Sequence, residues 1–144
     1  MATIKLEIVS PDKLVYSADI TMLIVRSTGG ELGILPKHAP LVTGLVPHAM
    51  RVRLGSDRDE QLIAVAGGFM EVTPDKITVL ATAAEQPIDI DINRAKEAMA
   101  RAKERLGRLH QNAADAKDID VERAQLAMQR AMARLRATKT EFQE

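Results

Sequence analysis

The stretch Pro87-Ile88-Asp89-Ile90-Asp91-Ile92-Asn93-Arg94-Ala95 separates two halves of the chain that have different sequence patterns. Before it, short runs of alternating apolar and polar residues are separated by Gly, Pro, Ser and Asp. After it, there is no proline, Gly107 is the only glycine, and apolar residues recur every three or four positions. A period of two is typical of strands and a period of 3.6 of helices. The sequence therefore predicts an α+β protein that changes architecture at residue 87.

In the first half, the pattern predicts a strand at residues 3–9, where Ile4, Leu6 and Ile8 alternate with polar neighbours. Further β-branched or alternating runs lie at 20–25, 50–54, 61–66 and 76–81. Many short strands separated by turn residues indicate an all-β sandwich or barrel. We therefore expect residues 1–87 to form a β-sandwich domain.

The second half carries two apolar stripes with helical spacing. The first consists of Ile92, Ala95, Met99, Ala102, Leu106 and Leu109, and the second of Val121, Ala124, Met128, Ala131 and Leu135. The polar segment 111–117 between them predicts a turn, and Asp118 or Asp120 is a candidate cap for the second helix. We therefore expect residues 88–144 to form an antiparallel two-helix hairpin.

The hairpin stripes are rich in Ala and Met, so they offer little apolar area per residue. A hairpin of this kind can detach or straighten at modest cost. The alternative is a stable helical appendage that never moves.

The composition argues against several functions. Positive and negative side chains balance at 20 each, and aromatic residues are only 2%, so nothing indicates nucleic-acid binding. There is no cysteine, and His38, His48 and His110 lack metal-ligand spacing. Walker A and G-x-S-x-G motifs are absent. We therefore expect a protein that is not an enzyme, and the absence of a signal peptide or an apolar span leads us to expect a soluble, cytoplasmic one.

One long motif reads Gly29-Gly30-Glu31-Leu32-Gly33-Ile34-Leu35-Pro36-Lys37-His38-Ala39-Pro40-Leu41. It resembles the signature of the epsilon subunit of bacterial F-type ATP synthases. The upstream segment at residues 10–16 and a further segment at residues 65–72 also resemble this family, and the similarity covers the whole chain. From the residues alone, we expect the glycines to form a tight loop.

The resemblance implies a non-catalytic rotor subunit in the central stalk of a proton-translocating complex. Its expected partners are the gamma subunit, the membrane c-ring and, through extended C-terminal helices, the catalytic alpha and beta subunits. The expected location is peripheral, on the cytoplasmic face of the cell membrane. Glu31 and His38 are the residues that the resemblance places near the rotor ring. The C-terminal helices are expected to inhibit ATP hydrolysis.

A second motif, Ile90-Asp91-Ile92-Asn93-Arg94-Ala95, is similar to the I/L-D-x-x-R-A motif of epsilon subunits that bind ATP. The resemblance assigns Ile90, Asp91, Arg94 and Ala95 to the nucleotide, with Glu85 as a further polar partner. Because no Walker lysine is present, we expect regulatory ATP to bind without hydrolysis and without a required metal.

Helix geometry adds basic residues to this site. Arg94 and Arg101 share one helical strip, and Arg130 and Arg134 share another. With the turn near residue 114, these strips lie at matching levels of the hairpin, where an anion would relieve their mutual repulsion. The alternative is four solvated surface arginines. For the whole chain, the alternative function is a generic adaptor built from a β-sandwich and a helical hairpin.

The change of pattern near residue 87 predicts that the first half assembles independently. A chain that ends at Ala84 is expected to fold and to bind a gamma subunit. Co-purification with gamma measures this, and failure of the shortened chain to fold or bind contradicts the modular interpretation.

Overall fold

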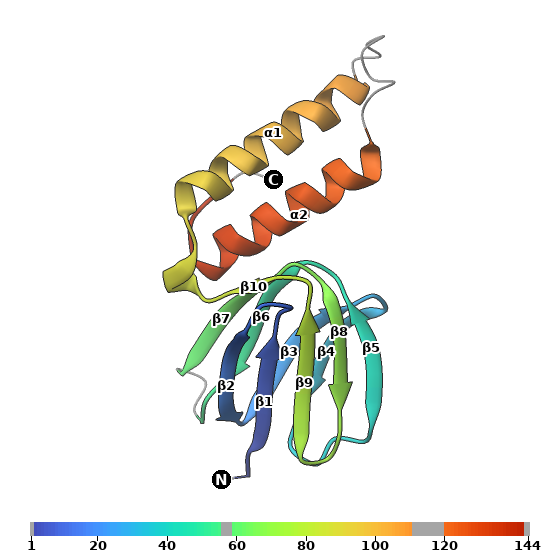
Figure 1. Ribbon diagram of the computed structural model, residues 1–144, viewed down its shortest axis with the longest axis vertical. Coiled ribbons are helices and arrows are strands. Elements are labelled where there is room, and N and C mark those ends of the chain that lie inside the picture. The colour runs from blue at the N-terminus through green and yellow to red at the C-terminus, as the bar shows by residue number, and fades with distance from the viewer. Residues whose placement is uncertain (1, 56–58, 111–119, 143–144) are drawn as a thin grey trace.

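A computed structural model describes residues 2–55, 59–110 and 120–142 and shows a β-sandwich with a two-helix hairpin at one end (Figure 1). This confirms the expected fold class. The strands are β1 Ile4–Val9, β2 Leu14–Ile20, β3 Met22–Ser27, β4 Gly30–Ile34, β5 Leu41–Leu45, β6 His48–Arg53, β7 Glu60–Val65, β8 Gly68–Val72, β9 Lys76–Ala81 and β10 Ala84–Glu85. The helical elements are the 3₁₀ turn η1 Pro87–Asp89 and the helices α1 Ile92–His110 and α2 Val121–Ala137.

The sheet folds over on itself between β3 and β5, which meet only at Ser27 and Leu45. Its order is β10-β7-β6-β3-β5-β8-β9-β1-β2, with β4 paired to β3. The pairs are antiparallel except for β1 and β9, which are parallel. Alternate residues of the strands point inward and form one aliphatic core, whose fully buried members include Ile4, Leu6, Ile8, Leu23, Met50, Ile63, Met70 and Ile77.

The strand at residues 76–81 lies where the sequence predicts it. β3 begins two residues later than expected, and β2, β4, β5, β8 and β10 were not predicted. The expected tight loop at residues 29–33 is present only at its start, where residues 28 and 29 form the turn of the β3–β4 hairpin. Most of this segment is β4, where Glu31 pairs with Arg26, and only Gly30 of the three glycines has a positive φ, of 125°.

Gly68 shows why a glycine begins β8. Its φ is 139°, which side chains rarely adopt, and a Cβ at this position would collide with the backbone carbonyl of Leu80 on β9. The absence of a side chain therefore lets β8 and β9 approach each other.

Both helices begin at a capping aspartate. Asp91 precedes α1, and its Oδ1 accepts a hydrogen bond of 3.1 Å from the backbone N–H of Arg94. Asp120 caps α2 in the same way through the N–H of Arg123, at 3.1 Å, as the sequence predicts. The predicted turn at 111–117 and Asp118 lie outside the described residues.

α2 lies between α1 and the sandwich (Figure 1). The seam between the helices buries Ala95 and Met99 of α1 against Ala131 and Leu135 of α2. The contact between α2 and the sheet consists mainly of small residues. Ala133 and Ala137 pack with Ile90 against Ala49, Leu62 and Ala64 of β6 and β7. The hairpin is therefore folded against the sandwich through an interface of limited apolar area.

His48 is buried at the start of β6, with 6% of its surface exposed. Its Nε2 accepts a hydrogen bond of 3.1 Å from the backbone N–H of Arg26, so the ring proton is on Nδ1 and is donated to the carbonyl of Val46 at 2.7 Å. Burial lowers the pKa of His48 below its ordinary value. Protonation of Nε2 would also break the bond from Arg26.

The unfolding free energy is expected to fall as the pH drops below about 6.5, because the unfolded state then binds a proton that the folded state resists. His48→Gln removes this titration, so its unfolding free energy is expected to depend less on pH between about 6.5 and 5. Urea denaturation of both proteins across this range measures the difference. If the unfolding free energies of the two proteins change with pH in the same way, His48 is not the group responsible for the loss of stability.

Candidate functional site

A cavity of about 270 Å³ lies where the linker after the sandwich meets both helices. It is lined by acidic and basic side chains and by two small residues, namely Glu85, Asp89, Asp91, Arg94, Ala95, Ala98, Arg101 and Arg134. Three carboxylates and three guanidinium groups therefore surround one space. Such a site suits a ligand that carries both anionic oxygens and hydrogen-bond donors.

The local structure explains how α1 contributes to the cavity. Asp91 is fixed by its capping bond, and Arg94 follows in the first turn of the helix. Arg101 lies seven residues later on the same strip, with Ala98 between them. Because alanine is small, a ligand can approach the helix surface between the two arginines.

Glu85 and Arg134 close one side of the cavity with an ion pair. The Arg134 Nε donates to the Glu85 Oε1 at 2.7 Å, joining α2 to β10 at the edge of the sandwich. Both side chains are about one-third exposed, at 34% and 31%. Within residues 2–55, 59–110 and 120–142, the guanidinium groups of Arg94 and Arg101 have no ion-pair partner. These two groups are therefore available to an anion.

The structure brings together most of the residues that the sequence assigns to ATP. Glu85, Asp91, Arg94, Ala95, Arg101 and Arg134 all line the cavity. Arg130 instead lines a narrow neighbouring crevice together with Glu85 and Arg134. Ile90 is buried among Ala64, Ala133 and Ala137, where it contributes to the contact between the domains.

Two lining residues, Asp89 and Ala98, were not identified from the sequence. Ala98 falls between Arg94 and Arg101 at helical spacing, so extending the same strip would have found it. Asp89 precedes the motif by one residue, and its role depends on the course of η1, which the spacing does not predict.

Glu31 and His38 lie near opposite ends of β4. Glu31 is exposed near the start of β4 and lines a separate hollow of about 480 Å³ with Arg51 and Arg136. His38 lies in the loop after β4, and its Nδ1 is 2.6 Å from the carbonyl oxygen of Ala39. The structure therefore does not gather these two residues into one site, and a shared ring contact stays a prediction.

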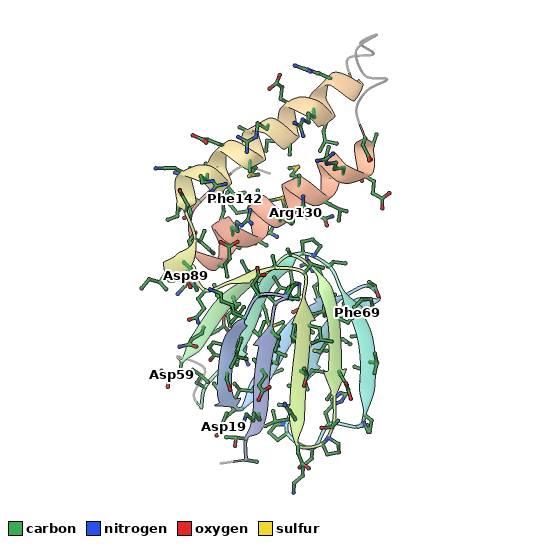
Figure 2. All side chains as sticks on the ribbon, viewed as in Figure 1. Asp19, Asp59, Phe69, Asp89, Arg130 and Phe142 are labelled. Carbon is green, nitrogen blue, oxygen red and sulfur yellow. The ribbon has the colours of Figure 1, made fainter. Side chains whose placement is uncertain are left out.

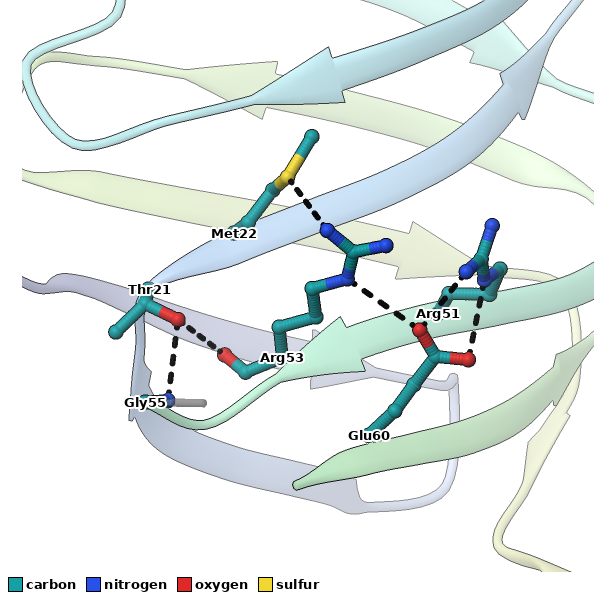
Figure 3. Close-up of polar contacts among 6 residues, drawn as sticks. All are labelled: Thr21, Met22, Arg51, Arg53, Gly55 and Glu60. Atoms are coloured by element: carbon teal, nitrogen blue, oxygen red, sulfur yellow. Dashed lines mark hydrogen bonds and ion pairs between the residues drawn. The ribbon is translucent and has the colours of Figure 1, made fainter. Parts of the chain in front are cut away.

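An ion cluster on β6 and β7 includes two residues that line this hollow, Arg51 and Glu60 (Figure 3). The Glu60 carboxylate accepts two hydrogen bonds from Arg51, at 3.1 and 3.0 Å, and one from Arg53 at 3.4 Å. Hydrogen bonding to Arg51 is the main reason why the pKa of Glu60 is lowered. This carboxylate is engaged by both arginines, so its role is structural.

Among the residues with described positions, no group of three His, Asp or Glu side chains is arranged to hold a metal ion. None of the helices in the described part is both long and apolar enough to cross a membrane.

The fold and the cavity define a two-domain protein in which a helical hairpin, folded onto a β-sandwich, encloses a charged site beside the linker. The chain belongs to the ATP synthase delta/epsilon chain family. The family's beta-sandwich domain matches residues 3–87, and its long alpha-helix domain matches residues 89–139.

Several curated relatives are similar along most of the chain. The ATP synthase epsilon chain of Alkalihalophilus pseudofirmus is 50% identical over 117 residues, which are 81% of this chain and 86% of the relative. That of Bacillus subtilis is 52% identical over 106 residues, covering 74% and 79%. Among solved structures, a chain of the Euglena gracilis mitochondrial ATP synthase matches 90% of this chain and 77% of its own length. Its TM-score is 0.69 and its identity 18%, which supports the fold.

The ion pair between Glu85 and Arg134 is expected to strengthen hairpin docking by about 1 kcal/mol or less, because both side chains are partly exposed. A double-mutant cycle with Glu85→Gln and Arg134→Gln measures this coupling, with hydrogen exchange of α2 as the readout of docking. The matched control is the pair Glu104 and Arg108, 2.8 Å apart within α1. Equal effects of both pairs on α2 contradict a docking role for Glu85 and Arg134.

Proposed function

We propose that this chain is the non-catalytic epsilon subunit of an F-type ATP synthase, and that ATP bound to its folded hairpin regulates its inhibition of ATP hydrolysis. Family membership and the names of the curated relatives support the first part. The charged cavity between linker and hairpin supports the second, and it is the observation on which the regulatory part rests.

The cavity offers ATP complementary groups on two sides. The guanidinium groups of Arg94 and Arg101, which have no ion-pair partner among the described residues, suit phosphate oxygens, since arginine forms several charge-assisted hydrogen bonds at once. Asp89 and Asp91 provide acceptors for the amino and hydroxyl groups of a nucleoside. No phosphate-loop lysine is among the residues that line the cavity, so in this proposal ATP acts as a ligand that is not consumed, and no metal is required.

Bound ATP favours the folded hairpin because the cavity exists only in that state. Its lining residues come from β10, the linker, α1 and α2. A ligand specific for one state stabilises it by RT ln(1 + [L]/Kd), about 2.7 kcal/mol at a hundredfold excess over Kd. A stabilisation of this size can decide an equilibrium that depends on an alanine-rich interface.

Release of the hairpin frees basic side chains on α2. Residues 121–140 carry five basic residues and one acidic residue. In the folded state Arg134 is paired with Glu85, and Arg130 lines the adjacent crevice. An extended α2 presents these charges to acidic surfaces of the catalytic alpha and beta subunits, which restrains hydrolysis.

In this proposal the sandwich binds the gamma subunit and the c-ring, which places the chain peripherally on the cytoplasmic face of the membrane. Glu31 and His38 remain the residues proposed to face the ring. Glu85 also contacts the sandwich through β10, and the Gln86 side chain donates a hydrogen bond of 2.8 Å to the Val15 carbonyl. A shortened chain that ends at Pro87 therefore preserves more of the sandwich contacts than one that ends at Ala84.

Calorimetric titration of the whole chain with ATP is expected to give saturable binding. Arg94→Ala and Asp91→Ala are each expected to weaken it about tenfold or more, because each removes charged hydrogen-bonding groups. Arg105→Ala is the matched control, since Arg105 is an exposed arginine of α1 outside the cavity lining. No saturable heat at millimolar ATP, or an equal loss in the control, contradicts the nucleotide site.

In the assembled enzyme, deletion of the residues after Ala116 is expected to raise ATP hydrolysis. Replacing Arg130 and Arg134 by Glu is expected to raise it partly, with an effect that shrinks at high salt because the attraction is electrostatic. Replacing Arg105 by Glu serves as the control for charge. Unchanged hydrolysis after the full deletion rules out an inhibitory tail.

A further inference from the structure

The chain reverses direction directly after α2. Lys139 has a φ of 57°, in the left-handed region, and the N–H of Thr140 donates to the carbonyl of Leu135 at 2.9 Å. The Thr138 hydroxyl lies 3.1 and 3.0 Å from the carbonyls of Arg134 and Leu135, and 2.8 Å from the Thr140 hydroxyl. This is a closed C-terminal cap, so residues 138–142 have a defined course rather than a simple extension of the helix.

The reversal places Phe142 on the hairpin (Figure 2). Its ring is partly buried against the seam cluster, whose buried members are Ala95, Met99, Ala131 and Leu135. The guanidinium carbon of Arg136 lies 5.4 Å from the ring centroid, within the range of a cation–π interaction. Phe142 is one of two phenylalanines in the chain, and it adds aromatic area to a seam otherwise built from Ala, Met and Leu.

The seam and the nucleotide cavity share residues. Ala95 is buried in the seam and also lines the cavity, and Ala98 packs against the seam and lines the same cavity. A change in the distance between α1 and α2 therefore moves one wall of the cavity. It also moves Arg94 and Arg101, on α1, relative to Arg134, on α2.

We propose that residues 138–142 form a C-terminal clasp, in which Phe142 is a positioning residue that holds α1 against α2 and so maintains the nucleotide cavity. The part that concerns ATP rests on the proposed function. Phe142 packs on a cluster to which both helices contribute, so separating the helices removes the share of this packing that α1 supplies. The clasp therefore favours the folded hairpin even before a ligand binds.

The first test compares Phe142→Ala, Phe142→Leu and the control Phe69→Ala in the full chain. Phe69 is 64% exposed on β8, away from the hairpin. Without ATP, Phe142→Ala is expected to speed amide exchange in α1 roughly tenfold, because the seam opens more often. With ATP, it is expected to weaken the apparent affinity about threefold or more, because fewer molecules are competent to bind. For Phe142→Leu, the exchange rate of α1 and the apparent ATP affinity are expected to stay close to those of the unmodified chain. Phe69→Ala is expected to leave both the exchange rate and the affinity unchanged.

The second test addresses the backbone turn. Lys139→Gly is expected to preserve the protection of α1, since glycine adopts a positive φ readily, whereas Lys139→Val is expected to reduce it. Equal protection in both variants contradicts the role of the turn.

The outcomes separate the clasp from the nucleotide site. Unchanged exchange of α1 in Phe142→Ala overturns the clasp, whatever ATP does. If Phe142→Ala speeds amide exchange in α1 but leaves the ATP affinity unchanged, Phe142 does not position the nucleotide cavity. If the unmodified chain does not bind ATP, the proposed function fails, and exchange of α1 still decides whether the clasp exists.

Discussion

The contact between α2 and the sheet is the constraint on which the arrangement of this molecule depends. Ala133 and Ala137 meet Ala49 and Ala64, so the helix lies close to the strands but buries little apolar area. The charged cavity exists only while this contact is made, because β10 supplies one of its walls and the hairpin supplies the others. Small residues thus allow close docking at a small gain in buried apolar area, which suits the release of the hairpin in the proposed mechanism.

The same side chains serve the folded state and, in the proposed mechanism, the inhibited complex. Arg134 completes an ion pair across the domains, and Arg136 stacks over Phe142. While they are engaged in this way, they are less available to an acidic partner. In the proposed mechanism, folding and inhibition therefore use some of the same charges, so the ion pair of the folded state disfavours the inhibited complex modestly.

The sequence predicted the hairpin better than the sandwich, for a physical reason. The seam residues Ala95, Met99, Ala131 and Leu135 follow a helical period that depends only on local geometry. β4 contains two glycines and a glutamate, and it is a strand because β3 lies beside it, a long-range pairing that no local pattern encodes. Arginine spacing likewise placed Arg94, Arg101 and Arg134 around one space. It could not direct Arg130 to the neighbouring crevice or Ile90 to the domain contact, since those positions depend on how the hairpin rests on the sheet.

The parallel pairing of β1 with β9 affects the order of events during synthesis. β1 ends at Val9, but its neighbour β9 begins only at Lys76, so this edge of β1 has no partner until most of the sandwich has been made. At typical translation rates the delay is on the order of several seconds. β10, η1 and then the hairpin follow β9, and the docking surface on β6 and β7 is already complete when α2 leaves the ribosome. The nascent chain therefore closes its sheet first and receives its helices last.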